Sequence, residues 1–86
     1  MYEHWFVGEF SLIEMDMAYD NAYPLKPSTF RLSASNHAKL TQLLMYYRRF
    51  NNSDVVDVDF RVDTYYGCKV YADSMVPDNC IIVESS

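Results

Sequence analysis

The chain has 86 residues, of which 50% are hydrophobic and 16% aromatic, and it carries a formal net charge of −5 at pH 7. This length predicts one domain covering residues 1–86. The aromatic side chains supply enough apolar surface for one core without metal or disulfide staples. The negative net charge argues against general affinity for nucleic acid, which depends on a basic field.

The scarcity of glycine and cysteine excludes further classes of site. There are two glycines, whereas phosphate-cradling loops need several. Cys68 and Cys80 lack CxxC spacing, so the favoured interpretation is two buried free thiols rather than a disulfide. The apolar runs are shorter than the roughly 20 residues of a membrane helix, and the N-terminus has acids where a signal peptide would have lysines. The sequence predicts a cytoplasmic protein, in the host cell if phage-encoded, with no membrane contact, cofactor or metal.

The N-terminal third is predicted to contain a strand and a connector. Residues 3–17 alternate imperfectly, which favours a strand with apolar groups on both faces. A helical spacing also fits four of these apolar residues, namely Phe6, Phe10, Ile13 and Met17. Residues 18–29 predict a connector, because Asp20-Asn21 and two prolines interrupt regular structure. Its tyrosines are interpreted either as contact residues or as ordinary loop packing.

The middle of the chain predicts one amphipathic helix. Residues 30–33 are expected to be extended, and Ser33 or Ser35 then caps a helix over residues 36–50. Its apolar positions recur every three and four residues and form one stripe, made of Leu40, Leu43, Leu44, Tyr47 and Phe50. Arg48 and Arg49 lie in the last turn, where cations complement the helix dipole.

The C-terminal part predicts a three-stranded antiparallel meander. Residues 54–63 show strict period-two alternation, with valines on one face and acids on the other. Residues 64–67 predict a tight connection to a strand that begins at Cys68, and residues 76–79 have turn chemistry before a last strand over residues 80–84. The expected fold is α+β: one helix packed on an antiparallel sheet of three to five strands, with the valine face of residues 56–62 against the helix.

Charge is segregated along the chain. Residues 31–50 contain no Asp or Glu, and all 12 acidic residues lie elsewhere. Within the predicted strand, Asp57, Asp59 and Asp63 share one face. Three interpretations stay open for this row: a solvated strand face, a charge-presenting surface, and a site for a hard cation at the Asp57/Asp59 pair. Arg61 would compete with such a cation.

Two tyrosine pairs are candidate contact residues. Tyr65 and Tyr66 lie at the predicted hairpin tip, and tyrosine is enriched in interfaces. Tyr46, with Arg48 and Arg49, forms a second candidate surface on the helix. The cations scatter around the helix, which favours dipole compensation and a solvated helix face over direct nucleic-acid binding.

The sequence therefore predicts a non-enzymatic protein-interaction module. The partner is expected to be a protein with a basic surface that handles nucleic acid, bound by Asp57, Asp59, Asp63, Tyr65 and Tyr66. In general composition the chain resembles small acidic inhibitors encoded by phages, although no motif assigns a family. One alternative is a subunit of a homo-oligomer with head-to-tail contacts between an acidic sheet and a basic helix. Another is a metal-binding or enzymatic protein that uses Asp57 and Asp59.

Overall fold

The computed structural model describes residues 1–51 and 64–85, with the side chains of residues 47–51 excepted. Over these residues the chain forms two helices and one five-stranded sheet, which is an α+β fold. The elements in chain order are β1 (Tyr2–Trp5), α1 (Leu12–Asn21), β2 (Pro27–Leu32), α2 (Ala34–Asn51), β3 (Thr64–Tyr65), β4 (Cys68–Ala72) and β5 (Cys80–Ser85). Among the described residues, no helix is both long and apolar enough to cross a membrane.

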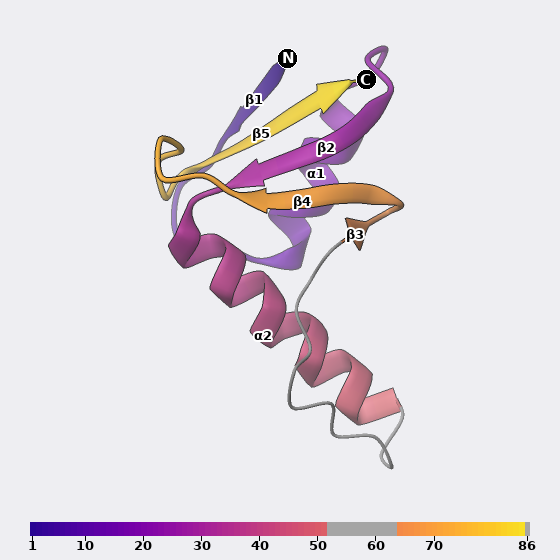
Figure 1. The fold of residues 1–86 in the computed structure, drawn as a ribbon, viewed down its shortest axis with the longest axis vertical. Helices are drawn as coiled ribbons and strands as arrows, with labels where there is room; N and C mark the ends of the chain where they lie inside the picture. Colours follow the sequence, from indigo (N-terminus) through magenta and orange to yellow (C-terminus); the bar gives the residue numbers. More distant parts are fainter. Residues whose placement is uncertain (52–63, 86) are drawn as a thin grey trace.

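The sheet is mixed, with the strand order β1-β5-β2-β4-β3. β2 and β4 pair in parallel, and the other three neighbouring pairs are antiparallel. Parallel pairing follows from the long connection between these two strands, which contains α2 and returns the chain to the end of the sheet where β2 began. Figure 1 shows α1 behind the sheet and α2 extending past the β4 edge.

The predicted antiparallel meander is wrong. β4 and β5 follow each other in the chain, but β2 lies between them and pairs with both. The turn at residues 73–79 therefore crosses the end of β2 instead of closing a hairpin. The first strand predicted for the meander, residues 54–63, and its valine face lie outside the described residues.

The strand predicted for residues 3–17 is wrong beyond Trp5. Leu12–Asn21 is a helix, α1, which also removes the first part of the predicted connector. Its buried stripe is formed by Met15 and Ala18, with Leu12 packed against the core beside them. Ile13 and Met17, which share the helical spacing noted above, are instead exposed. The single predicted helix is therefore one of two in the described chain.

The helix predicted for residues 36–50 is confirmed as α2, and the extended stretch before it is confirmed as the end of β2. Ser33 is the cap: its Oγ accepts a hydrogen bond of 3.1 Å from the backbone N–H of Asn36. The Asn36 side chain donates to the backbone carbonyl of Asp78 at 2.6 Å. The first bond caps the start of α2, and the second anchors it to the loop before β5.

The core lies between the sheet and the two helices. Phe30 and Leu32 of β2, together with Val83 of β5, are fully buried in this core. Leu40 of α2 is also fully buried in this cluster. The predicted pair of buried free thiols is confirmed for Cys68 and Cys80.

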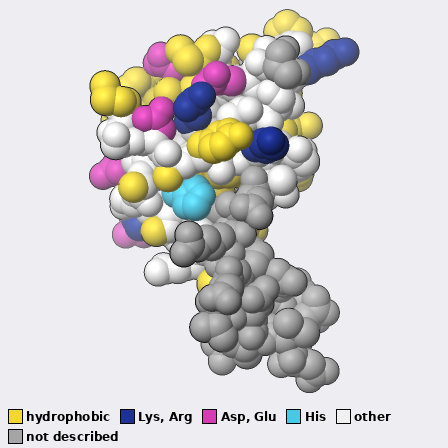
Figure 2. Space-filling model, in the orientation of Figure 1, with side chains coloured by type: hydrophobic (Ala, Val, Ile, Leu, Met, Phe, Trp, Pro, Cys, Tyr) yellow, Lys and Arg dark blue, Asp and Glu magenta, His cyan; other side chains and the backbone are white. Residues whose placement is uncertain are grey.

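The alternate side chains of the strands form the opposite face, which we call the outer sheet face. It includes Glu3, Trp5, Thr29, Arg31, Lys69, Tyr71, Ile82 and Glu84, and the buried Cys80 lies on the same side, opposite Trp5. Figure 2, in the orientation of Figure 1, shows basic, acidic and hydrophobic side chains interspersed on the side turned to the viewer.

Candidate protein-binding surface

One surface combines exposed apolar groups, acids and a tyrosine. The outward side of α1 carries Ile13, Asp16, Met17 and Asp20, whose spacing of three and four residues places them in one row. The tip of the β3–β4 hairpin adds Tyr66, which contacts this row through Asp16. We call these five residues the α1–hairpin surface. Ile13 is 68% exposed and Tyr66 is 58% exposed, so large apolar groups face the solvent here.

Asp16 is the polar centre of this surface. Its Oδ1 accepts hydrogen bonds from the hydroxyls of Tyr65, at 2.7 Å, and Tyr66, at 2.8 Å. Burial, and then the hydrogen bond to the Asp16 carboxylate, raises the pKa of Tyr65 above its usual value. The hydrogen bond to Asp16 is the first cause that raises the pKa of Tyr66. Both tyrosines are therefore held as neutral donors, and Asp16 is fixed in position as an acceptor.

Aromatic packing links this surface to the core. The Tyr65 and Tyr66 rings meet nearly edge to face, with centroids 4.7 Å apart, and Tyr66 lies 4.9 Å from Tyr19 of α1. Tyr65 in turn contacts the fully buried Phe30 at 6.0 Å. Such arrangements add to the energy of area burial. They hold the hairpin tip against α1 as one rigid unit.

The turn that presents Tyr66 has an unusual backbone conformation. Tyr66 and Gly67 both have positive φ, 52° and 75°, as a two-residue hairpin turn of the primed type requires. Gly67 adopts this conformation at no steric cost, whereas a bulky residue such as Tyr66 is strained in it. The aromatic contacts and the bond to Asp16 offset that strain.

The charged residues of the α1–hairpin surface are all acidic. α1 contains Glu14, Asp16 and Asp20 but no Lys or Arg. Glu14 pairs with His4, whose Nε2 lies 2.7 Å from its carboxylate. Within residues 1–46 and 64–85, neither Asp16 nor Asp20 forms an ion pair. In this part of the chain, then, the two charges are not matched by a Lys, Arg or His.

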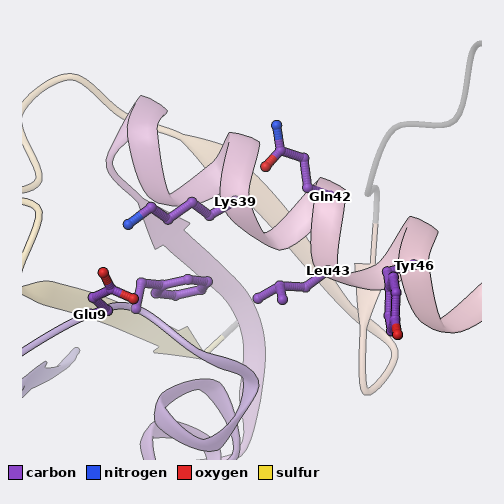
Figure 3. Close-up of a pocket in the computed structure, with 6 residues that line it drawn as sticks. Glu9, Lys39, Gln42, Leu43 and Tyr46 are labelled. Atoms are coloured by element: carbon purple, nitrogen blue, oxygen red, sulfur yellow. The ribbon is translucent and has the colours of Figure 1, made fainter.

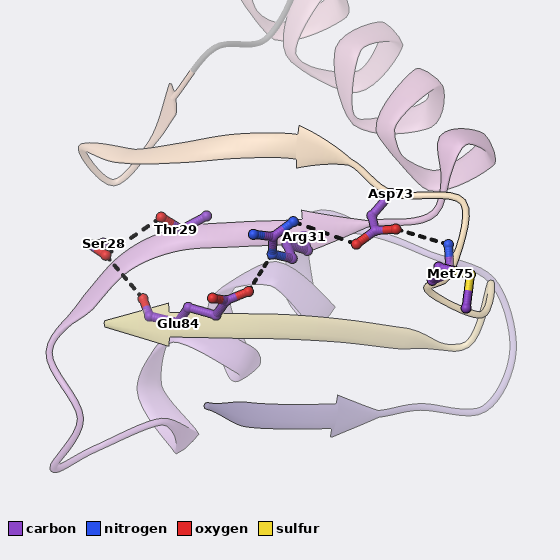
Figure 4. A network of polar contacts seen from close by, with 6 residues as sticks. All are labelled: Ser28, Thr29, Arg31, Asp73, Met75 and Glu84. Carbon is purple, nitrogen blue, oxygen red and sulfur yellow. Dashed lines mark hydrogen bonds and ion pairs between the residues drawn. The ribbon is translucent and has the colours of Figure 1, made fainter. Parts of the chain in front are cut away.

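The outer sheet face differs because Glu84, one of its two acids, is paired with an arginine of the same face. Arg31 donates from Nε to Glu84, and its Nη1 lies 3.5 Å from Asp73 (Figure 4). The Arg31 guanidinium also lies over the ring of Tyr71, 5.9 Å from its centroid. Asp73 accepts a further bond from the backbone N–H of Met75. This network gives a mixed face rather than an acidic one.

A groove lies beside α2. It has a volume of about 320 Å³, and Figure 3 shows Lys39, Leu43 and Tyr46 on the side of the helix that faces Glu9. Lys39 and Tyr46 stand toward its two ends, and Glu9 borders it from the loop after β1. Its lining is Glu9, Phe10, Lys39, Gln42, Leu43 and Tyr46.

The predicted site residues fall into three groups. Tyr65 and Tyr66 lie at a hairpin tip, as predicted, and the structure brings them to Asp16. Tyr46 lines the α2 groove, 65% exposed, while Arg48 and Arg49 lie in α2 with side chains that are not described. The remaining three, Asp57, Asp59 and Asp63, lie outside the described residues.

Sequence reasoning missed the acidic and apolar row of α1. The signal for this helix was present as Ser11-Leu12-Ile13-Glu14, because Ser followed three residues later by Glu marks a helix start. Ser11 does precede the helix, and its carbonyl accepts a bond from the Glu14 N–H at 3.1 Å. With α1 recognised, Asp16 and Asp20 would have shared a face with Ile13 and Met17.

The described residues also bear on metal binding and on thiol chemistry. Among them, no group of three or more His, Cys, Asp and Glu residues is arranged to hold a metal ion. The buried His4 contacts Glu14 and stacks on Phe6, an arrangement that ties β1 to α1. The thiol of Cys68 donates to the backbone carbonyl of Pro27, and burial raises its pKa, which disfavours the nucleophilic thiolate.

Comparison with known proteins adds no family assignment. No protein-family model, no curated protein and no solved structure matches this chain.

Proposed function

We propose that the protein is a non-enzymatic interaction module whose α1–hairpin surface binds a basic segment of a protein partner. The observation that carries this proposal is the Asp16 carboxylate, held by two tyrosine hydroxyls between the exposed side chains of Ile13 and Met17. It supplies a fixed negative charge inside an apolar border. A partner that offers a Lys or Arg flanked by apolar residues matches this pattern.

The arrangement of charge supports a basic partner rather than an acidic one. The whole chain carries a net charge of −5, so its field attracts basic molecules over distance. Asp20 lies one helical turn from Asp16 and adds a second charge on the same side of α1. Neither acid is neutralised within the described ranges 1–46 and 64–85. Long-range attraction and local contacts therefore select the same kind of partner.

The rigidity of the surface also favours binding. Ordering flexible side chains on association costs about 0.5–1.5 kcal/mol for each. Tyr65 and Tyr66 have already lost that freedom, because their rings pack together and their hydroxyls are bound to Asp16. A partner that docks here therefore meets side chains already in position.

Nucleic-acid-handling proteins are the class of partner that this chemistry fits. Such proteins carry basic surfaces for phosphate, and a rigid acidic surface competes with nucleic acid for them. On this proposal the chain acts as an inhibitor that covers the basic surface of its partner. The row of Asp57, Asp59 and Asp63 is proposed as a second acidic contact of the same kind.

Affinity capture with charge-neutralised variants tests this proposal. The wild-type protein and an Asp16→Asn/Asp20→Asn variant are immobilised in parallel and exposed to an extract of the cells that naturally produce the protein. Bound proteins are quantified by mass spectrometry. We expect a basic protein that the wild type retains at low salt, that elutes as salt is raised, and that the variant loses.

Two further variants make the result specific. Asp78→Asn is the matched control, since Asp78 is exposed and its contact with Asn36 uses the backbone carbonyl rather than the carboxylate. A triple Asn variant at positions 57, 59 and 63 tests the second acidic row separately. An identical set of captured proteins for the wild type, the control and the Asp16/Asp20 variant would contradict the role of the α1–hairpin surface.

A further inference from the structure

The outer sheet face has a charge pattern that is complementary to itself. Thr29 of the central strand β2 pairs in register with Glu84 of β5 on one side and with Lys69 of β4 on the other. Neighbouring strands lie about 4.8 Å apart, so the acid and the base stand at equal distances from β2. Their charges are opposite, and both side chains point to the same face.

We propose that two copies of the chain pack face to face through their outer sheet faces, around a two-fold axis that runs along β2. This operation exchanges the two sides of β2, so Glu84 of each copy meets Lys69 of the other. The strands of the two sheets then align to within the roughly 30° that sheet twist imposes, at about 10 Å separation. An isologous dimer of this kind closes on itself, unlike the head-to-tail assembly considered from the sequence.

The next row of residues fits the same arrangement. Ile82, Arg31 and Tyr71 are in register on β5, β2 and β4, so the two-fold axis brings Ile82 of one copy onto Tyr71 of the other. Tyr71 is 45% exposed in the single chain and gains an apolar neighbour in the dimer. This contact supplies the apolar burial that an ion pair alone does not give.

The axis also brings the two Arg31 side chains toward each other. Each guanidinium carries its own compensation, since Arg31 pairs with both Glu84 and Asp73. Lys69, by contrast, is exposed and pairs with no acid among the described residues. The charge that gains most from a second copy is therefore Lys69.

The proposed dimer goes beyond the proposed function and uses the other side of the molecule. α1 lies behind the sheet, so the two α1–hairpin surfaces stay on the outside of the dimer (Figure 1). α2 extends past the β4 edge, and the two-fold axis sends the two α2 helices to opposite sides. Two outward binding surfaces allow one dimer to bind a partner bivalently.

A charge-swap experiment tests the dimer. The mass in solution of the wild type, Lys69→Glu and Glu84→Lys is measured by sedimentation equilibrium over a concentration series at low salt. Each variant alone places like charges together twice, so we expect dimerisation to weaken roughly tenfold or more. Mixing the two variants restores both opposite-charge contacts, so the mixture is expected to form a heterodimer.

The control is Lys39→Glu, which makes the same charge change on α2, where Lys39 lines the groove away from the outer sheet face. It is expected to dimerise like the wild type. Glu84→Lys loses the bond to Arg31 and could fail to fold for that reason. In that case the comparison of Lys69→Glu with Lys39→Glu is sufficient to test the dimer. A wild type that stays monomeric, or a Lys69→Glu variant that dimerises as well as Lys39→Glu, would overturn the proposal. Either result leaves the α1–hairpin proposal standing, because partner capture does not require a dimer.

Discussion

Removing the hydrogen bond between Tyr65 and Asp16 should destabilise the fold by about 1 kcal/mol. A hydrogen bond to a charged group contributes about 1.5–3 kcal/mol when it is shielded from water. The bond is short, at 2.7 Å, but Tyr65 is only partly buried, so water competes for the hydroxyl and we take a value below this range. Tyr65→Phe keeps the ring and its contact with Phe30, so the loss reports the hydroxyl alone.

A double-mutant cycle separates this bond from other effects of the substitutions. Tyr65→Phe, Asp16→Ala and the double variant are unfolded in urea and followed by circular dichroism. The coupling free energy should be about 1 kcal/mol, because the second substitution removes a bond that the first has already broken. A loss of this size lowers the melting temperature of a domain of this length by about 4–8 °C.

The matched control for this cycle is Tyr2→Phe. Tyr2 is half-buried against the same core, and no hydrogen bond from its hydroxyl to another described residue is present. We expect a change within about 0.5 kcal/mol for this variant. A coupling free energy near zero between Tyr65 and Asp16 would refute the argument that Asp16 anchors the hairpin.

Three further predictions concern the fold. Ser33→Ala should cost about 1 kcal/mol of unfolding free energy in urea, while Ser35→Ala should cost little, because Ser33 caps α2. Leu40→Ala should cost about 2–5 kcal/mol in the same assay, because Leu40 is fully buried. The pKa of Tyr65 is higher in the folded state than its usual value of 10.0, so the neutral hydroxyl contributes its full stabilisation below pH 10. This contribution is lost as the pH rises through the pKa of the folded state. Unfolding free energy should therefore fall above about pH 10, and less steeply in Tyr65→Phe.

The sequence predicted well those elements that have strong local signals. α2 has a serine cap and an apolar stripe, and the β3–β4 hairpin has a glycine at the turn position that needs positive φ. α1 was missed because Ile13 and Met17 are apolar yet exposed, which obscured the buried stripe around Met15 and Ala18. The local hydrophobic pattern therefore did not predict a helix whose apolar residues lie partly on the surface instead of in the core.

Long-range pairing explains the other differences. The insertion of β5 between β1 and β2 depends on contacts between segments far apart in the sequence, such as Tyr2 with Val83 and Phe30 with Val83. The candidate site also depends on contacts between distant parts of the sequence. Tyr65 and Tyr66 were recognised as contact residues, but Asp16, which accepts their hydrogen bonds, lies 49 and 50 residues away. A period-two or period-3.6 pattern carries no information about such pairs.

Site-specific photo-crosslinking tests the central claim that the α1–hairpin surface is the binding surface. A photoreactive phenylalanine derivative replaces Met17 in one variant and Met75 in another, and each is irradiated in extract of the cells that produce the protein. Met75 is 86% exposed against 43% for Met17, so exposure alone would favour adducts at position 75. The account predicts a discrete adduct with a basic protein from position 17, lost when Asp16 and Asp20 become Asn, and none of that adduct from position 75. The same adduct from both positions, or from position 75 alone, would contradict it.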